Sequence, residues 1–224
     1  MSMINNNELT EIGIMNPLPY KNSLPDWGMR VLDYVAPRIL VGVDEITRNC
    51  FPSGSRKGRK QLVYLSQVRY LKRYELASSD RHYIAYSQGI EGIRKTGIIA
   101  PEEINIIKAQ ELIIANKFCN INNITNFFFK LNSKGLVLGE IQFKGKQYSM
   151  WCPRLMEKEK RLKSLLSEIP LSSNGLMVIA PNLKYIYNLA DSLKFLYIPV
   201  YFAVDFVLDQ FTELVNGVLV PALL

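Results

Sequence analysis

Histidine and cysteine are scarce in this chain, and each shortage excludes a class of protein. The 224 residues include one histidine, His82, and three cysteines, Cys50, Cys119 and Cys152. One histidine cannot build the metal-binding histidine cluster of a rolling-circle relaxase, and a Ser-His-Asp triad would have to recruit His82 alone. The cysteines are odd in number and widely spaced, so they form neither a CxxC metal pair nor a disulfide framework. Their pattern indicates a reducing, cytoplasmic location.

Long apolar runs, a secretory signal and a phosphate-binding loop are also missing. The most apolar stretch, "FLYIPVYFAVDFVLDQFTELV", is interrupted by Asp205, Asp209 and Glu213, and a membrane span needs about 20 uninterrupted apolar residues. The start "MSMINNNELTEIG" is polar and has no basic region, and "GIEGIRKTG" lacks the Lys-Ser ending of a P-loop. We therefore expect no membrane partner, no metal and no nucleotide or other cofactor.

Acidic residues are absent from Ile46 to Tyr74, and this gap is the most informative one. The window contains eight cations: Arg48, Arg56, Lys57, Arg59, Lys60, Arg69, Lys72 and Arg73. Since the whole chain carries +7, the residues outside the window carry −1. An excess of positive charge confined to one short region favours a polyanionic partner.

The segment before this window predicts an arm and two short helices. Residues 1–25 are rich in asparagine and proline, which predicts a loosely held arm. Asp26 is expected to cap a first helix that Pro37 ends, and Asp44 a second one over "DEITRNCF". The next three residues, "PSG", are typical of a turn.

The basic window itself predicts a third helix followed by a hairpin. A helix from Ser55 to Gln67 would place Gly58, Leu62 and Leu65 on one packing face. "RYLKRYEL" and "RHYIAYS", separated by "ASSD", are typical of two paired strands. Three helices and a β-hairpin together predict a winged helix-turn-helix over residues 26–92.

A winged helix-turn-helix with a basic third helix predicts sequence-preferring binding of double-stranded DNA, with the contact centred on that helix. Cations would mostly meet phosphates, and Arg56, Lys57, Gln61 or Tyr64 could reach base edges. For the two serines near the helix start, capping is an alternative to phosphate contact. The expected DNA-binding residues are Ser53, Ser55, Arg56, Lys57, Arg59, Lys60, Gln61, Tyr64, Lys72, Ser79, Arg81 and His82.

Residues 93–224 predict a separate α/β domain. "PEEINIIKAQELIIANKF" is typical of a helix, and "TNFFFKL", "GLVLGEIQFKG" and "KQYSMWC" of successive strands. Four elements are expected next: an amphipathic helix over 154–169, the buried strand "GLMVIAP", a helix over "NLKYIYNLADSL" and a strand over "KFLYIPVYFA". A last helix is expected at the end of the chain. Strands first and then alternation with helices predict a mixed sheet, and the fold class is α+β.

The run "DEITRNCFPSGSRKGRKQLVYLSQVRYLKRYEL" followed by "HYIAYSQGIEGIRKTG" resembles the winged-helix half of the replication-relaxation proteins of plasmids and mobile elements. Phe51-Pro52, the basic helix with spaced leucines, and Tyr83 to Gly89 carry the resemblance, whereas Ala85-Tyr86-Ser87 departs from the family's leucine and threonine. The match covers about a third of the chain. Winged-helix regulators of the MarR and PadR type share the same pattern.

The resemblance implies a restriction-endonuclease-like core in the second half and a role in plasmid replication, transfer or transcription control. Metal-assisted phosphodiester cleavage requires at least two converging carboxylates, and the three strands predicted first offer only Glu140, with Lys144 and Lys146 nearby. We therefore expect a nuclease-like fold that is not an enzyme. An active metal-dependent nuclease using Glu140, and a module that recruits a replication, transfer or partition protein, are the alternatives.

The requirements of DNA recognition and the apolar C-terminal segment together predict an oligomer. One short recognition helix makes few base contacts, and useful specificity usually requires two half-sites read by a symmetric pair. The predicted closing helix carries more apolar side chains than one face can hide: Phe206, Leu208, Phe211, Leu214, Val215, Val218 and Leu219. A homodimer through this segment is therefore expected, with closure of the domain's own core as the alternative.

Overall fold

The protein was analysed as a computed structural model that describes residues 8–14, 17–19, 23–51, 54–77, 82–99, 101, 103–131, 137–154, 172, 174–222 and 224. These residues form six α-helices and two β-sheets, so the chain is a mixed α+β protein, as expected. Two compact units divide it, Met1–Ala109 and Gln110–Leu224. None of the described helices is both long and apolar enough to cross a membrane.

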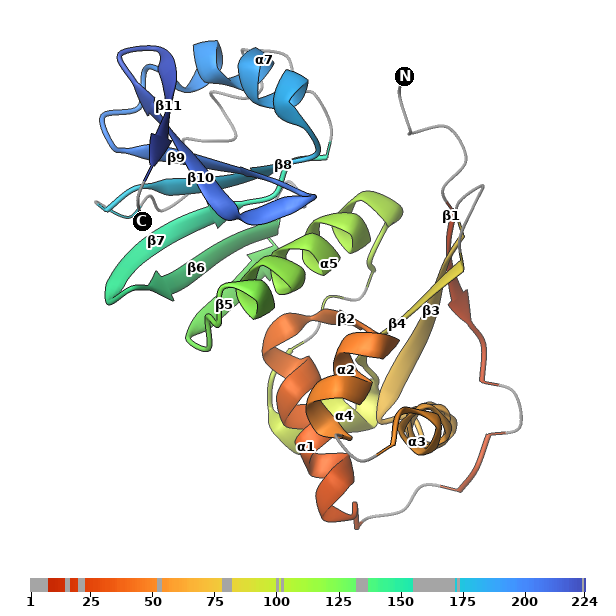
Figure 1. Ribbon diagram of the computed structural model, residues 1–224. Coiled ribbons are helices and arrows are strands. Elements are labelled where there is room, and N and C mark those ends of the chain that lie inside the picture. The colour runs from red at the N-terminus through yellow and green to blue at the C-terminus, as the bar shows by residue number, and fades with distance from the viewer. Residues whose placement is uncertain are drawn as a thin grey trace. The chain divides into compact units, whose positions relative to one another are not determined.

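The first unit packs its helices on a four-stranded antiparallel sheet (Figure 1). Its helices are α1 (Asp26–Val35), the 3-10 turn η1 (Ala36–Arg38), α2 (Val43–Cys50), α3 (Ser55–Gln67) and α4 (Ile90–Thr96). Its strands are β1 (Glu8–Ile12), β2 (Leu40–Gly42), β3 (Leu71–Ala77) and β4 (His82–Gln88), in the order β1-β3-β4-β2. The third helix and both hairpin strands are where the sequence pattern predicted them.

One hydrophobic core holds the first unit together. Its nearly or fully buried side chains are Val31, Leu32 and Val35 of α1, Ile46 of α2, Leu62 and Leu65 of α3, Tyr70 just before β3, Leu71 of β3 and Tyr86 of β4. Leucines at 62 and 65 stand three residues apart, so α3 turns both toward this core. The orientation of α3 is therefore set by apolar burial, worth roughly 1.5–3 kcal/mol for each large side chain.

The prediction of a loose arm over residues 1–25 is wrong for part of that range. β1 pairs with β3 in antiparallel register from Glu8↔Ala77 to Ile12↔Arg73, and the Leu18 amide donates to the Gln67 carbonyl at the end of α3. Backbone pairing of this kind depends little on side-chain pattern, which is why polar "ELTEI" gave no strand signal.

The predicted aspartate caps are also wrong. Pro25 and Gly42 occupy the N-cap positions of α1 and α2, without a side-chain cap bond, while Asp26 and Asp44 lie in the first turn. A proline before the helix and carboxylates inside its first turn still favour helix initiation, because the carboxylates face the positive end of the helix dipole.

Helix α4 was not anticipated and it extends the first unit beyond the expected boundary at residue 92. Gly92 of α4 is buried, and a Cβ there would lie 2.4 Å from the Tyr70 carbonyl oxygen, so only glycine allows this close approach. Gly97 in the left-handed conformation ends the helix. The unit continues to Ala109, within the first turn of α5 (Ile106–Ile121).

The second unit is built on a seven-stranded mixed sheet in the order β11-β10-β9-β8-β7-β6-β5. β5 (Phe127–Leu131), β6 (Val137–Phe143) and β7 (Lys146–Trp151) form an antiparallel meander, whereas β7, β8 (Leu176–Ala180) and β9 (Val200–Val204) are parallel. β8 is buried along its whole length at the centre, as its unbroken apolar run predicted. The mixed sheet is confirmed.

Two helices cover opposite faces of this sheet (Figure 1). α7 (Leu183–Leu193) packs on β8 and β9 through Ile186, Leu189 and Leu193, and its N-cap Asn182 accepts a bond from the Tyr185 amide. On the other side Phe118 of α5 meets Phe211 edge-on, with ring centroids 6.0 Å apart. The amphipathic helix predicted over 154–169 lies outside the described residues apart from Arg154.

The predicted closing helix is wrong. Residues 207–222 form two antiparallel strands, β10 (Val207–Val215) and β11 (Val218–Ala222), joined by Asn216-Gly217. Both turn residues have positive φ, 51° and 79°, which is the type I′ geometry that Asn-Gly favours in two-residue hairpins. The valines at 207, 215, 218 and 220 also favour a strand.

The expected dimer surface assumed a terminal helix with too many apolar side chains to bury, and the hairpin takes the place of that helix. Leu208 is 2% exposed, Phe211 packs on Phe118 and Phe143, and Leu214 and Leu219 pack on the sheet's own core. Only Phe206, Val215 and Val218 of the seven apolar residues remain largely exposed. A homodimer stays a prediction, without a crowded terminal helix to drive it.

Candidate nucleic-acid interface

The sequence-predicted binding residues centre on α3, whose inner face is fixed by close packing. Gly58 is buried, and a Cβ there would lie 2.7 Å from the ring of Phe51, at the end of α2. The absence of a side chain at 58 therefore lets α2 and α3 approach, and Leu62 and Leu65 continue the same face. The rest of α3 is turned outward as a consequence.

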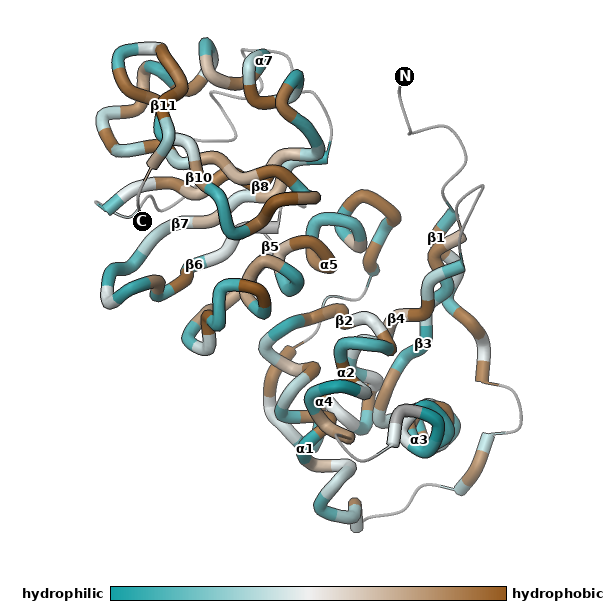
Figure 2. Tube along the Cα trace, in the orientation of Figure 1, coloured by the Kyte–Doolittle hydropathy of each residue, from teal (hydrophilic) through white to brown (hydrophobic). Residues whose placement is uncertain are grey.

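Three cations occupy the outward side of the first two turns of α3. Arg56, Lys57 and Lys60 are exposed, and none of them has an acidic partner among the described residues. We call these three side chains the cationic face. Hydrophilic residues dominate the visible part of α3 in Figure 2.

Three other predicted contact residues lie beside carboxylates. Arg59 pairs with Asp44 of α2 at 2.6 Å, Lys72 with Glu11 of β1 at 3.5 Å, and His82 with Glu75 of β3 at 2.8 Å. Asp44 and Glu11 lie outside the acid-free window in the sequence, and the fold brings them to Arg59 and Lys72 within it. The positive charge is thereby reduced around these residues and concentrated on the cationic face.

Gln61 and Tyr64 do not project from α3 as the cations do. The Gln61 Oε1 atom is buried, and Tyr64 is half-buried with its ring 6.3 Å from that of Trp27. Gln61 and Tyr64 stand three residues apart on the same side of the helix, and the ring of Tyr64 lies near α1. Tyr64 contributes to packing in the free protein.

The remaining predicted residues are placed only in part. Ser55 begins α3, and the N-cap position belongs to Gly54. Ser53, Ser79 and Arg81 lie outside the described residues.

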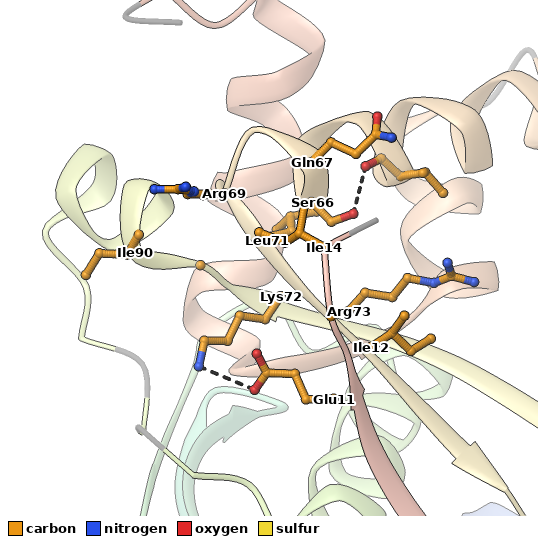
Figure 3. A pocket seen from close by; sticks show the side chains of 13 residues that line it. Glu11, Ile12, Ile14, Ser66, Gln67, Arg69, Leu71, Lys72, Arg73 and Ile90 are labelled. Atoms are coloured by element: carbon orange, nitrogen blue, oxygen red, sulfur yellow. Dashed lines mark hydrogen bonds and ion pairs between the residues drawn. The ribbon is translucent and has the colours of Figure 1, made fainter. Parts of the chain in front are cut away.

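Sequence reasoning missed a hollow next to the cationic face. β1 and the following residues line a space of about 280 Å³ with Val63, Ser66 and Gln67 of α3, Arg69, the start of β3, and Gly89-Ile90 (Figure 3). Val63 and Gln67 continue the stripe of Arg56 and Lys60 at helical spacing. The sequence feature that could have indicated this hollow is the same helical stripe, in which the cations Arg56 and Lys60 are followed by the apolar Val63.

Buried hydroxyl and thiol groups of the first unit are poor nucleophiles. Burial raises the pKa of Cys50 to about 11 and that of Tyr83 to about 12, with Glu45 and Asp44 adding to the Tyr83 effect. Both groups therefore stay protonated near neutral pH.

The Glu140 region of the second unit presents a shallow polar hollow. Asn126, Gln142 and Gln147 line it with Glu140, whose Oε2 accepts a 3.3 Å bond from Gln147, and Asn126 donates to Gln142 at 2.8 Å. Glu140 is the one carboxylate among the described residues that line this hollow. Amides in place of carboxylates give a weak donor set for a divalent cation.

A second polar cluster lies where the parallel strands end. Arg154 after β7 makes two bonds to Asp205 after β9, at 3.1 and 3.2 Å, and Lys117 of α5 donates to the Asp205 carbonyl. The Arg154 side chain is 7% exposed, and burial raises the pKa of Asp205 despite this cation. Burial likewise raises the pKa of the neighbouring Cys152 thiol. The ion pair therefore links the ends of β7 and β9, and the Arg154 side chain is almost inaccessible to a substrate.

Comparison of the chain with protein-family models, with curated proteins and with solved structures found no match. Function must therefore be inferred from the geometry of the cationic face.

Proposed function

We propose that the chain binds double-stranded DNA through the first two turns of α3, as a winged helix-turn-helix protein. The supporting observation is the cationic face: Arg56, Lys57 and Lys60 are exposed side by side with no described acidic partner. Exposed cations without partners are suited to phosphate contacts.

Their place on the helix strengthens the proposal. Arg56 and Lys57 lie in the first turn of α3, at the positive end of the helix dipole, which costs roughly 0.3–1 kcal/mol each, and this turn has no acid to offset the cost. A DNA phosphate brought to the same place would be stabilised by both the cations and the helix dipole. An arrangement that disfavours the free protein but favours the complex is expected at a binding site.

The order of elements agrees with the winged-helix architecture. Two helices with a short strand between them precede α3, and β3 and β4 follow as an antiparallel hairpin. In this architecture the third helix enters the major groove and the hairpin lies along the backbone. Lys72 and His82 of the hairpin are then secondary contacts, because each already has a carboxylate neighbour.

The resemblance to replication-relaxation proteins extends the proposal to replication, transfer or transcription control of a plasmid or mobile element. In that setting the second unit is a non-catalytic partner or dimer module. An active nuclease would require a second carboxylate beside Glu140, and the described lining of that hollow offers amides.

Fluorescence anisotropy with a labelled duplex over a range of salt concentrations tests the proposal. Reversing Arg56, Lys57 and Lys60 to Glu should weaken binding roughly a thousandfold, at about 1.4 kcal/mol or more for each lost charge-assisted contact. The matched control reverses Lys95, Lys146 and Lys184, which are exposed elsewhere and give the same change in net charge. Replacing the three cations by Gln should lower the slope of log K against log salt by about 2.7.

Equal loss of binding in the control variant would show that net charge, and not the cationic face, attracts DNA. Unchanged binding in the α3 variant would reject the proposal. Circular dichroism of both variants checks that the fold is intact, since all six substituted side chains are exposed.

A further inference from the structure

The hollow between α3 and β1 combines an apolar lining with excess positive charge. Its lining includes apolar surface from Ile12, Ile14, Val63, Leu71 and Ile90. It also includes three cations, Arg69, Lys72 and Arg73, and a single described carboxylate, Glu11. Lys72 is already paired with Glu11, so two cations remain in excess. Figure 3 shows Ile14 and Leu71 beside Ser66, with the Glu11–Lys72 ion pair below them.

Arg73 marks where a polar group of a ligand would bind. Its Nε atom is buried and has no hydrogen-bond partner among the described residues. A buried donor without an acceptor is disfavoured by roughly 1–3 kcal/mol. Arg73 also lines the hollow, so an anionic head bound there would lie beside this cation.

Exposed apolar side chains in the lining of the hollow indicate that the rest of the ligand is apolar. Ile14 and Ile90 line the hollow and are 42% and 50% exposed, so part of their apolar surface stays in water in the free protein. A bare phosphate would gain nothing from these side chains and would lose hydration beside them. An apolar body joined to an anionic head satisfies both features.

We propose that this hollow binds a small carboxylate with an apolar body, its head at Arg73 and its body against Ile12, Ile14 and Leu71. The volume, about 280 Å³, is at the small end of ligand pockets, which favours a single aromatic ring or a short branched chain.

Binding here acts directly on α3. Val63, Ser66 and Gln67 form one wall of the hollow, and Arg56 and Lys60 lie on the same helix stripe. A bound carboxylate adds negative charge beside the cationic face and repels DNA phosphates. The ligand therefore lowers DNA affinity, and DNA lowers ligand affinity by the same factor. This coupling rests on the proposed function, whereas the pocket itself does not.

Calorimetry and amide chemical shifts of the full chain without DNA test the pocket. The probes are benzoate and 4-methylpentanoate, each at about 10 mM, where a ligand with a millimolar Kd is mostly bound. Benzamide, which has the apolar body without a charged head, is the control for the anionic head. Inorganic phosphate, which is an anion without an apolar body, is the control for the body. Both carboxylates should shift the amides of residues 12–14, 63–67 and 71–73, and the two controls should not.

Arg73→Gln removes the proposed anchor and should weaken carboxylate binding tenfold or more. The thermal midpoint should not fall, because the substitution removes an unpartnered buried donor. Lys95→Gln, an equal charge change on an exposed side chain, should bind like the wild type. Val63→Phe should block binding by filling the hollow, which tests the site by shape instead of charge.

Each other outcome overturns the pocket proposal. Equal binding of benzamide would reject the anionic head, and equal binding of phosphate would identify a plain anion site. No shift with either carboxylate, or unchanged binding in both variants, would reject the site.

DNA titrations with and without about 10 mM benzoate then test the coupling. Duplex affinity should fall about fivefold or more in the wild type and stay unchanged in Arg73→Gln. Carboxylate binding without this effect would reject the coupling and keep the pocket. Failure of the duplex to bind at all would reject the proposed function and leave the calorimetric result standing.

Discussion

Arg59 and Asp44 of the first unit form an ion pair in which both side chains are 60% exposed, whereas Arg154 of the second unit meets Asp205 with only 7% of its side chain exposed. Each pair joins two different elements of its own unit. Exposed charges remain hydrated, so they contribute little stability and can be shared with an incoming polyanion. A buried charge such as that of Arg154 depends on its partner, because burial has removed most of its water. The charges of the Arg59–Asp44 pair thus remain exposed to solvent, whereas the Arg154–Asp205 pair is part of the packed structure.

The largest expected effect comes from breaking the buried pair. Asp205→Ala leaves Arg154 without its carboxylate and should lower the free energy of unfolding of the second unit by about 2–3 kcal/mol. This value is below the full range for a buried pair because Asp205 is 31% exposed. Urea denaturation measures the loss.

The two tryptophans allow each unit to be followed separately. Trp27 lies in the first unit and Trp151 in the second. In a Trp27→Phe background the fluorescence of Trp151 reports the second unit alone. The double change Arg154→Met with Asp205→Leu should recover much of the stability, since it leaves no unpaired charge. No difference between Asp205→Ala and the parent would show that the buried pair is as dispensable as an exposed one.

A smaller effect is expected from pH. Burial raises the pKa of Asp205 above its ordinary value, with Arg154 only partly opposing this, so the folded state binds the proton more tightly than the unfolded state. Between the unfolded pKa of about 3.9 and the raised folded pKa, the contribution of Asp205 to stability therefore falls as pH rises. Above the folded pKa it is constant.

Denaturation midpoints of the parent and of Asp205→Asn, measured from about pH 4 to pH 7, isolate this contribution. The parent should lose stability relative to the variant as pH rises through the window. A relative gain would mean that the attraction of Arg154 exceeds the effect of burial.

The smallest effect on stability is expected from substituting single cations of α3. Two neighbouring cations, Arg59 and Lys60, should nevertheless differ clearly in their effect on DNA binding. Arg59→Gln and Lys60→Gln should each change the free energy of unfolding by less than about 0.5 kcal/mol, because both side chains are exposed. Lys60→Gln should lower the salt slope of DNA binding by about 0.9. Arg59→Gln should lower it less, because Asp44 already holds Arg59. Equal slopes for the two variants would show that the Asp44 pair opens on DNA binding.

The main elements could be predicted from the sequence wherever burial alone decides them. Leu62 and Leu65 turn one side of α3 inward whatever the neighbouring elements are, and the helix runs from Ser55 to Gln67 as predicted. The unbroken apolar run of β8 required a place inside a sheet, and β8 is its central strand. The Asn216-Gly217 turn could also have been predicted, and the apolar residues around it were mistaken for a helix face.

Sequence alone determined which residues carry charge and which face of each strongly patterned element is apolar, because these follow from side-chain chemistry and chain periodicity. Only the tertiary structure decided which of those charges have partners. Asp44 and Glu11 lie outside the acid-free window, yet folding places them on Arg59 and Lys72, while Arg56, Lys57 and Lys60 keep no described acidic partner. The addition of β1 to β3, which builds one wall of the hollow beside α3, depends on backbone hydrogen bonds that no side-chain pattern encodes.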